Sequence, residues 1–230
     1  MKKINNKIPR SLALATVVLA TAATSQAAVL ATWDVWDSGS ADSTTSGFTA
    51  MIAGFDTIRS DRGIADGTFG NDLAGASSGD TRSAAYRGTS SNVMTLTLTN
   101  GTASAYSIDS LHFDFGVRTN EPNSFTANYT SGGLGPAPTL LDTQTSLAQQ
   151  NSTNGNLFQF DYNLSSSLAD TILAAGESAV FTVDFSFDTG SGSSLSLIDN
   201  VALQGTAVPE PSSAALLGLG GLALILRRRR

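Results

Sequence analysis

Hydrophobic and polar residues alternate along several short stretches in the second half of the chain. In residues 93–100, Met94, Leu96 and Leu98 alternate with threonines. A period of two places the apolar side chains on one face of a β-strand and the polar ones on the other. The same pattern predicts further half-buried strands at residues 111–115, 158–164, 181–187 and 195–203.

The remaining residues carry weaker signals. Residues 29–36 predict a first strand that turns Trp33 toward the core. Residues 37–92 are rich in glycine, serine, threonine and aspartate and keep no long hydrophobic period, so they predict loops with one or two short strands. One helix is predicted at residues 167–175, and Gly176 would end it as a C-terminal cap.

Short strands separated by glycine, serine and asparagine turns predict an all-β domain at residues 28–205. We expect a two-sheet antiparallel sandwich that is jelly-roll-like. The string from Leu197 to Leu203 resembles the closing strand of jelly-roll carbohydrate-binding modules. Because the chain contains no cysteine, this domain has no disulfide and must be held together by its core.

Residues 1–27 have the three parts of a secretory signal peptide. The first ten residues hold four basic side chains, and residues 11–24 are small or apolar. Ser25 and Ala27 then occupy the −3 and −1 positions of a cleavage site. We expect a signal helix that directs the chain to the Sec translocon and is removed by signal peptidase after Ala27. An uncleaved N-terminal membrane anchor is the alternative.

The last segment, residues 206–230, is a tail of three parts. Val208-Pro209-Glu210-Pro211 should be extended and stiff, because proline fixes its own φ and disfavours a helical residue before it. Residues 214–226 are apolar and uncharged. As a helix they would be about 20 Å long, against about 30 Å of bilayer hydrocarbon. The chain then ends in Arg227, Arg228, Arg229 and Arg230.

These four arginines determine the topology that we expect for the tail. Inserting each of them into a bilayer costs about 2.5–3.5 kcal/mol. We therefore predict a short transmembrane helix at the C-terminus, with the arginines on the cytoplasmic side as a stop signal.

The ordered tail resembles the PEP-CTERM sorting signal of Gram-negative bacteria. The resemblance covers residues 207–230 and rests on Val208 to Ser212, the glycine-rich run Leu216 to Leu222 and the terminal arginines. It implies recognition by exosortase, a polytopic membrane enzyme, and cleavage near the Pro-Glu-Pro. Proteins of this kind tend to accompany extracellular polysaccharide, which becomes a further candidate partner. A plain tail anchor with an incidental Pro-Glu-Pro is the alternative.

The distribution of charge narrows the possible ligands. Residues 28–208 hold five arginines and 18 acidic side chains, a formal net charge of −13. This charge argues against nucleic acid, whose phosphates would be repelled. It also argues against binding an acidic polysaccharide by charge alone. Neutral glycans and divalent cations remain open, and solubility of an exported domain also accounts for the excess of acids.

Asp199 breaks the hydrophobic pattern of its strand. It shares the phase of Leu197 and Val201, and a carboxylate cannot remain charged in a core without partners. We expect either a bulge at Ile198 that rotates Asp199 outward, or hydrogen bonds from Asp199 and Asn200 to a neighbouring loop. A structural Ca²⁺ is the alternative.

Candidate catalytic residues are sparse. His112 is the only histidine, lies on the polar phase of its strand and has no nucleophile-elbow motif beside it, so we interpret it as a solvated residue. No cluster of histidines indicates zinc. Asp61, Asp66 and Asp72 fit turns better than a standard calcium loop. Nothing in the sequence marks the pair of carboxylates that a glycosidase needs.

The sequence thus predicts an exported envelope or matrix protein without catalytic activity, cofactor or metal, sorted by its tail to the outer surface or the extracellular space. A carbohydrate-binding module is the second hypothesis, and a glycan hydrolase is the third. Sugar binding would use exposed aromatic rings. The candidates are Trp33, Trp36, Tyr86 and Tyr129, although Trp33 is expected to face the core.

Overall fold

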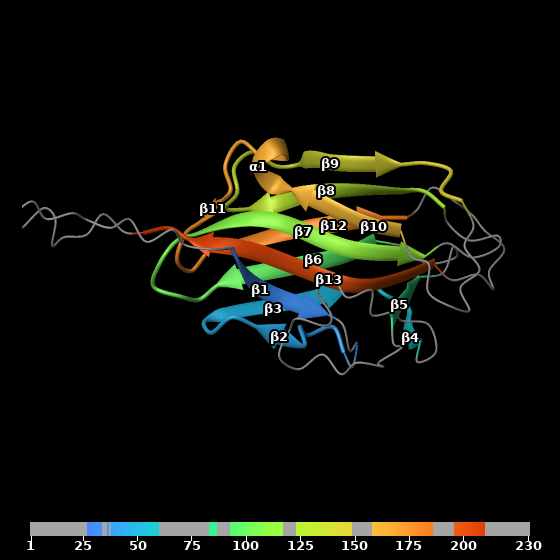
Figure 1. Ribbon diagram of the computed structural model, residues 1–230, viewed down its shortest axis with the longest axis horizontal. Helices are drawn as coiled ribbons and strands as arrows, with labels where there is room; N and C mark the ends of the chain where they lie inside the picture. Colours follow the sequence, from blue (N-terminus) through green and yellow to red (C-terminus); the bar gives the residue numbers. More distant parts are fainter. Residues whose placement is uncertain are drawn as a thin grey trace, which may run out of the picture.

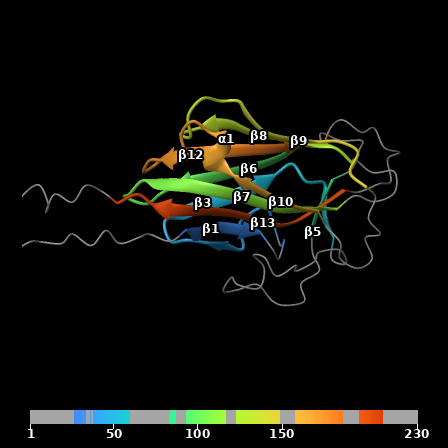
Figure 2. The same ribbon diagram turned by 45° about the horizontal axis from the view of Figure 1, so that its top comes forward.

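The computed structural model describes residues 27–33, 36, 38–59, 83–86, 93–116, 123–148, 158–185 and 196–209. This part of the chain consists mostly of β-strands, with a single short helix. The strands form two antiparallel sheets that pack face to face (Figures 1 and 2). The prediction of an all-β domain with two antiparallel sheets is therefore confirmed.

The first sheet is centred on β13, which pairs with strands from both halves of the chain. In spatial order it contains β10 (Phe158–Asn163), β7 (Tyr106–Gly116), β13 (Ser196–Ala207), β1 (Ala28–Trp33) and β2 (Ser43–Thr44). Three short strands extend it: β11 (Ile172–Leu173) pairs with β7, β5 (Ser83–Tyr86) pairs with β13, and β4 (Thr57–Arg59) pairs with β5.

The second sheet confirms the clearest alternating pattern of the sequence. Its spatial order is β3 (Phe48–Ala53), β6 (Val93–Asn100), β12 (Ser178–Asp184), β8 (Phe125–Gly132) and β9 (Thr139–Gln144). In β6, Met94, Leu96 and Leu98 are buried and the threonines between them are half-buried. The apolar face of this sheet is thereby turned toward the first sheet, and the threonine face is turned away from it.

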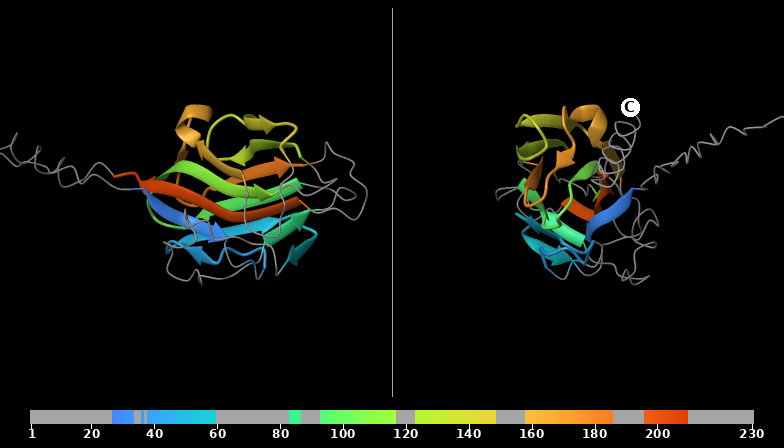
Figure 3. Two further views of the ribbon diagram at one scale, coloured as in Figure 1. Left: turned by 45° about the vertical axis from the view of Figure 1, so that its right-hand side comes forward. Right: turned by 90° about the vertical axis from the view of Figure 1, so that its left-hand side faces the viewer.

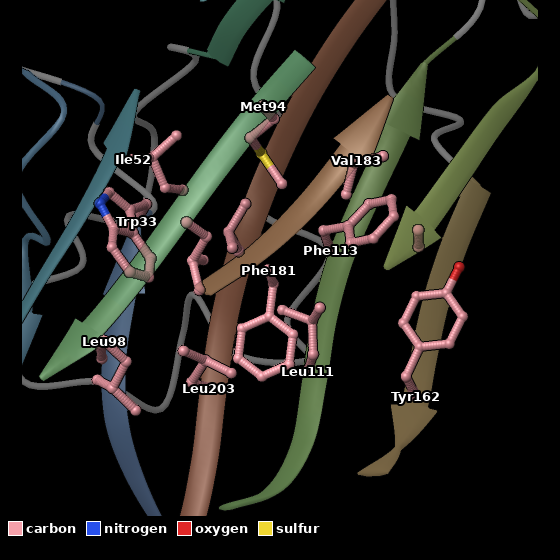
Figure 4. Packing of buried hydrophobic residues seen from close by; sticks show 14 of the residues in the cluster. Trp33, Ile52, Met94, Leu98, Leu111, Phe113, Tyr162, Phe181, Val183 and Leu203 are labelled. Atoms are coloured by element: carbon pink, nitrogen blue, oxygen red, sulfur yellow. The ribbon is translucent and has the colours of Figure 1, made fainter. Parts of the chain in front are cut away.

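The core between the sheets is rich in aromatic rings. The ring of Phe125 in β8 contacts those of Phe113, Phe115, Phe160 and Phe185, with centroids 4.8 to 6.1 Å apart. Figure 4 shows side chains of both sheets meeting in this layer, Phe181 and Val183 from one and Leu111 and Leu203 from the other. Trp33 is fully buried, as the sequence predicts.

The predicted helix at residues 167–175 is wrong. The helix of the described residues is α1, one turn at Leu164–Ser167, with Asn163 as its N-cap. Leu173 lies in β11 instead, because its fully buried side chain completes the core beside β7. Gly176 has a φ of 81° and belongs to a turn that leads into β12.

The strand count at residues 37–92 is also higher than predicted. The described parts of this region contain four short strands, β2 to β5, instead of one or two. β5 gives no alternating signal because all four of its residues are buried. β8 and β9 were not predicted from the sequence either. In β9 the exposed Leu140 breaks the expected alternation.

No helix within the described ranges is long and apolar enough to cross a membrane. The predicted signal helix and the predicted tail helix at residues 214–226 both fall outside those ranges.

Candidate functional site

The tail leaves the domain directly from the end of β13. After the last strand residue, Ala207, the backbone N–H of Val208 still donates a hydrogen bond to the carbonyl oxygen of Ala105 at 2.9 Å. Pro209 is exposed. The sorting motif is thus joined to the sheet with almost no linker. The other predicted sorting and stop residues lie outside the described part: Glu210, Pro211, Arg227, Arg228, Arg229 and Arg230.

The N-terminal strand starts at the same end of the molecule. β1 begins at Ala28, immediately after the predicted cleavage position Ala27, and Ala28 pairs with Gly205 of β13. In Figure 3, β1 (blue) begins where β13 (red) ends. Both predicted targeting segments are therefore attached to one end of the sandwich, and the two predicted cuts would leave every described strand in place.

A buried polar cluster lies on the face of the first sheet that is turned away from the core. Phe113 and Phe115 point into the core, so His112 and Asp114 on the same strand point to the opposite face. We define the polar cluster as His112, Asp114, Asp199 and Asn200, all of which are at most 2% exposed.

A β-bulge in β13 brings Asp199 into this cluster. Asp199 lies opposite Asp114, and Ala202 lies opposite His112, so two residues of β13 face a single residue of β7. Asn200, within the bulge, has a φ of 47°, a left-handed conformation that asparagine tolerates. The bulge lies two residues beyond the predicted position at Ile198.

Asp199 points away from the core, as a bulge was predicted to make it do, but its side chain is only 1% exposed and does not reach solvent. The indole Nε1–H of Trp36 donates to Asp199 Oδ1 at 3.0 Å, and the Nδ2–H of Asn200 donates to Asp114 Oδ2 at 2.7 Å. Asp199 and Asn200 thus form structural hydrogen bonds, which was the other possibility predicted from the sequence. Among the residues with described positions, no group of three or more acidic, histidine or cysteine side chains is arranged to hold a metal ion.

His112 bridges a buried and an exposed carboxylate. Its Nδ1 lies 2.6 Å from Asp161 Oδ1 on β10, and its Nε2 lies 3.3 Å from Asp114 Oδ1. The His112 side chain is 1% exposed, whereas that of Asp161 is 67% exposed. The interpretation of His112 as a solvated residue is therefore wrong. Pairing of β7 with β10 places Asp161 opposite His112, a register that the sequence does not reveal.

The environment of His112 favours its charged form. Burial disfavours the imidazolium, but hydrogen bonds to Asp114 and Asp161 and the charges of both carboxylates outweigh it, so the pKa of His112 is raised. Because the pKa of His112 is higher in the folded state, its protonation stabilises the fold. This stabilisation is fully present below the pKa of the unfolded state, which is near 6.5. That contribution is lost as the pH rises through the folded-state pKa of His112.

The aromatic rings that were candidates for stacking on sugars are not available. Trp36, Tyr86 and Tyr129 are fully buried, like Trp33, so the prediction of exposed aromatics is wrong. The hydroxyl of Tyr129 accepts a hydrogen bond from the backbone N–H of Leu134 at 2.9 Å. Burial and the nearby Asp56 carboxylate raise the pKa of the Tyr86 hydroxyl. These rings stabilise the core and do not form a binding platform.

An open polar groove lies beside the polar cluster on the same face of the first sheet. It encloses about 530 Å³ over β7, β10, β13 and α1. Its lining residues are Asp109, Ser110, Asp161, Tyr162, Asn163, Ser165 and Gln204. The groove was not predicted from the sequence. Its residues Ser110, Asp161, Asn163 and Gln204 lie on the polar phases of three strands, and only the pairing of those strands brings them together.

Comparison with known proteins identifies the tail. Residues 207–230 match the family model of the PEP-CTERM protein-sorting motif. The resemblance seen in the sequence is thereby confirmed for this segment, and it implies export and sorting by exosortase. No curated protein matches the chain.

Proposed function

We propose that this protein is an exported component of the cell envelope or extracellular matrix, without catalytic activity of its own, whose tail is cleaved by exosortase near the Pro-Glu-Pro. The chain would cross the inner membrane through the Sec translocon and lose residues 1–27 to signal peptidase. The tail would then hold the domain at the membrane until it is cut and the domain reaches the outer surface or the medium.

The observation that carries this proposal is the position of the two ends of the domain. The match to the sorting motif begins at Ala207, the last residue of β13, and the mature N-terminus would be Ala28, the first residue of β1. These strands are neighbours, so both membrane-directed segments meet the domain at one end. A domain held in this way presents the rigid Val208-Pro209 segment close to the bilayer, where a membrane enzyme can reach it.

The strand order supports a jelly-roll-like sandwich as the finer description of the fold. β1, β13, β7 and β10 adjoin in one sheet, and β6, β12, β8 and β9 adjoin in the other. Such an order results when a chain passes repeatedly between two sheets, as in the two Greek keys of a jelly roll.

The proposal is tested by changing Pro209 and Pro211 to alanine together. Because alanine restores flexibility and a backbone donor, the segment should no longer be held extended for the enzyme, and the uncut chain should accumulate in the membrane fraction. The matched control is Pro136→Ala, an exposed proline between β8 and β9. Membrane fractionation with mass measurement reads the result. Normal cleavage and release of the double variant would count against sorting through this motif.

A further inference from the structure

The polar groove presents side-chain groups that are already held in place. Ser110 Oγ donates to Gln204 Oε1 at 3.0 Å, which orients the amide and leaves its Nε2 as a donor. Asn163 Oδ1 accepts from the N–H and the hydroxyl of Ser165 at 3.1 and 2.7 Å, which leaves Nδ2 as a donor. Orienting a binding group before the ligand arrives lowers the entropic cost of association.

The carboxylates of the groove are oriented in the same way. Asp161 Oδ1 accepts from His112, which leaves Oδ2 as an acceptor at the exposed edge. Asp109 accepts hydrogen bonds from the hydroxyls of Ser107 and Thr206. The groove thus combines two amide donors with carboxylate acceptors, and none of its lining residues in the described part of the chain is basic.

This combination selects a class of ligand. A hydroxyl group both donates and accepts, so neighbouring hydroxyls of a sugar can pair with an amide N–H and with a carboxylate oxygen at once. An anionic ligand would be repelled by Asp109 and Asp161 and by the acidic domain. The groove can therefore hold neighbouring hydroxyls of a neutral sugar through hydrogen bonds.

We propose that the polar groove binds a neutral polysaccharide through hydroxyl contacts with Gln204, Asn163 and Asp161. The groove opens on the outer face of β7, β10 and β13, where an extended glycan can lie across the strands. This inference goes beyond sorting and rests on the groove alone, so it can fail while the tail is still cleaved by exosortase.

The test is a binding titration of the full-length chain in mild detergent. The probes are neutral hexasaccharides of glucose, mannose and galactose, an acidic oligogalacturonate and a lysine-rich peptide. We expect at least one neutral hexasaccharide to bind with a dissociation constant of about 1 mM, because the groove offers mainly polar contacts and the ring of Tyr162 in its lining is only 9% exposed. The acidic saccharide and the peptide should bind at least about tenfold more weakly.

Two variants remove donors without emptying the groove. Asn163→Asp keeps the oxygen that caps α1 and removes the amide donor, and Gln204→Met keeps the length of the side chain. Each should weaken binding of the neutral saccharide about tenfold. Thr97→Val, on the outer face of the second sheet, is the control and should bind like the parent chain. Thermal unfolding verifies that each variant is folded.

The proposal is overturned if no neutral hexasaccharide binds to the folded chain. Stronger binding of the acidic saccharide or of the basic peptide overturns it as well, and the latter would indicate a protein partner. Unchanged binding in both folded variants would place the saccharide elsewhere on the domain and would also overturn the assignment.

Discussion

Replacing Phe125 with alanine is expected to lower the free energy of unfolding by about 3–5 kcal/mol. Phe125 is fully buried in β8, and its ring contacts four other phenylalanine rings, two from β7, one from β10 and one just after β12. Truncating it removes contacts between the two sheets and leaves a cavity that rigid neighbouring rings cannot close. The loss is measured by denaturant unfolding of the purified protein.

The control for this substitution is Leu140→Ala in β9. Leu140 is 57% exposed, so its truncation should change the stability by less than about 0.5 kcal/mol. If Phe125→Ala cost no more than Leu140→Ala, the two sheets would not be held together by the aromatic layer as described.

Replacing Asp114 with alanine is expected to cost about 3–5 kcal/mol near neutral pH, because it leaves buried groups without their partner. Asp114 is fully buried, accepts the hydrogen bond of Asn200 and contacts the imidazole of His112. The matched control is Asp161→Ala, which removes the other carboxylate from the same imidazole. Because Asp161 is largely exposed, its contribution should be at most about 1 kcal/mol.

The same pair of variants tests the ionisation of His112. In the parent chain, the stability that His112 provides should be present below pH 6.5 and should fall as the pH rises through its raised folded-state pKa. Asp114→Ala should flatten this dependence, because one of the two carboxylates that favour the imidazolium is gone. Denaturant unfolding curves of the parent chain and both variants, recorded from below pH 6.5 to above neutral pH, measure this dependence. If Asp114→Ala and Asp161→Ala lowered the free energy of unfolding equally, the buried contact between Asp114 and His112 would stabilise the fold no more than the exposed one.

The parts of this protein that could be predicted from sequence are those whose signal is local. In β6, a strand with one buried and one polar face, side-chain character follows the period of two directly. The tail could be recognised because its prolines, apolar run and arginines follow one another in a fixed order. Neither feature depends on how distant strands pair.

The polar cluster and the groove could not be predicted because they depend on strand register. The sequence places His112 and Asp199 on their strands, but it does not reveal that a bulge aligns Asp199 with Asp114 or that β10 brings Asp161 to His112. The phase of a residue tells which face it shares with its neighbours, and it does not tell whether that face is covered. A histidine on the polar phase of a strand can therefore be buried, as His112 is.

The helix prediction failed for a related reason. Residues 167–175 contain good helix formers, yet Leu173 is needed in the core beside β7, and an extended pair at β11 places it there. Tertiary packing outweighed local helix propensity, which differs by at most about 0.7 kcal/mol per residue among the residue types in this segment.

The most direct test of the account is the intact mass of the protein recovered from the outside of the producing cells. We predict a single product that begins at Ala28 and ends within or just after Pro209-Glu210-Pro211, because both cuts then fall immediately outside β1 and β13. A full-length chain from Met1 to Arg230, found in the cytosol and never attached to a membrane, would contradict it.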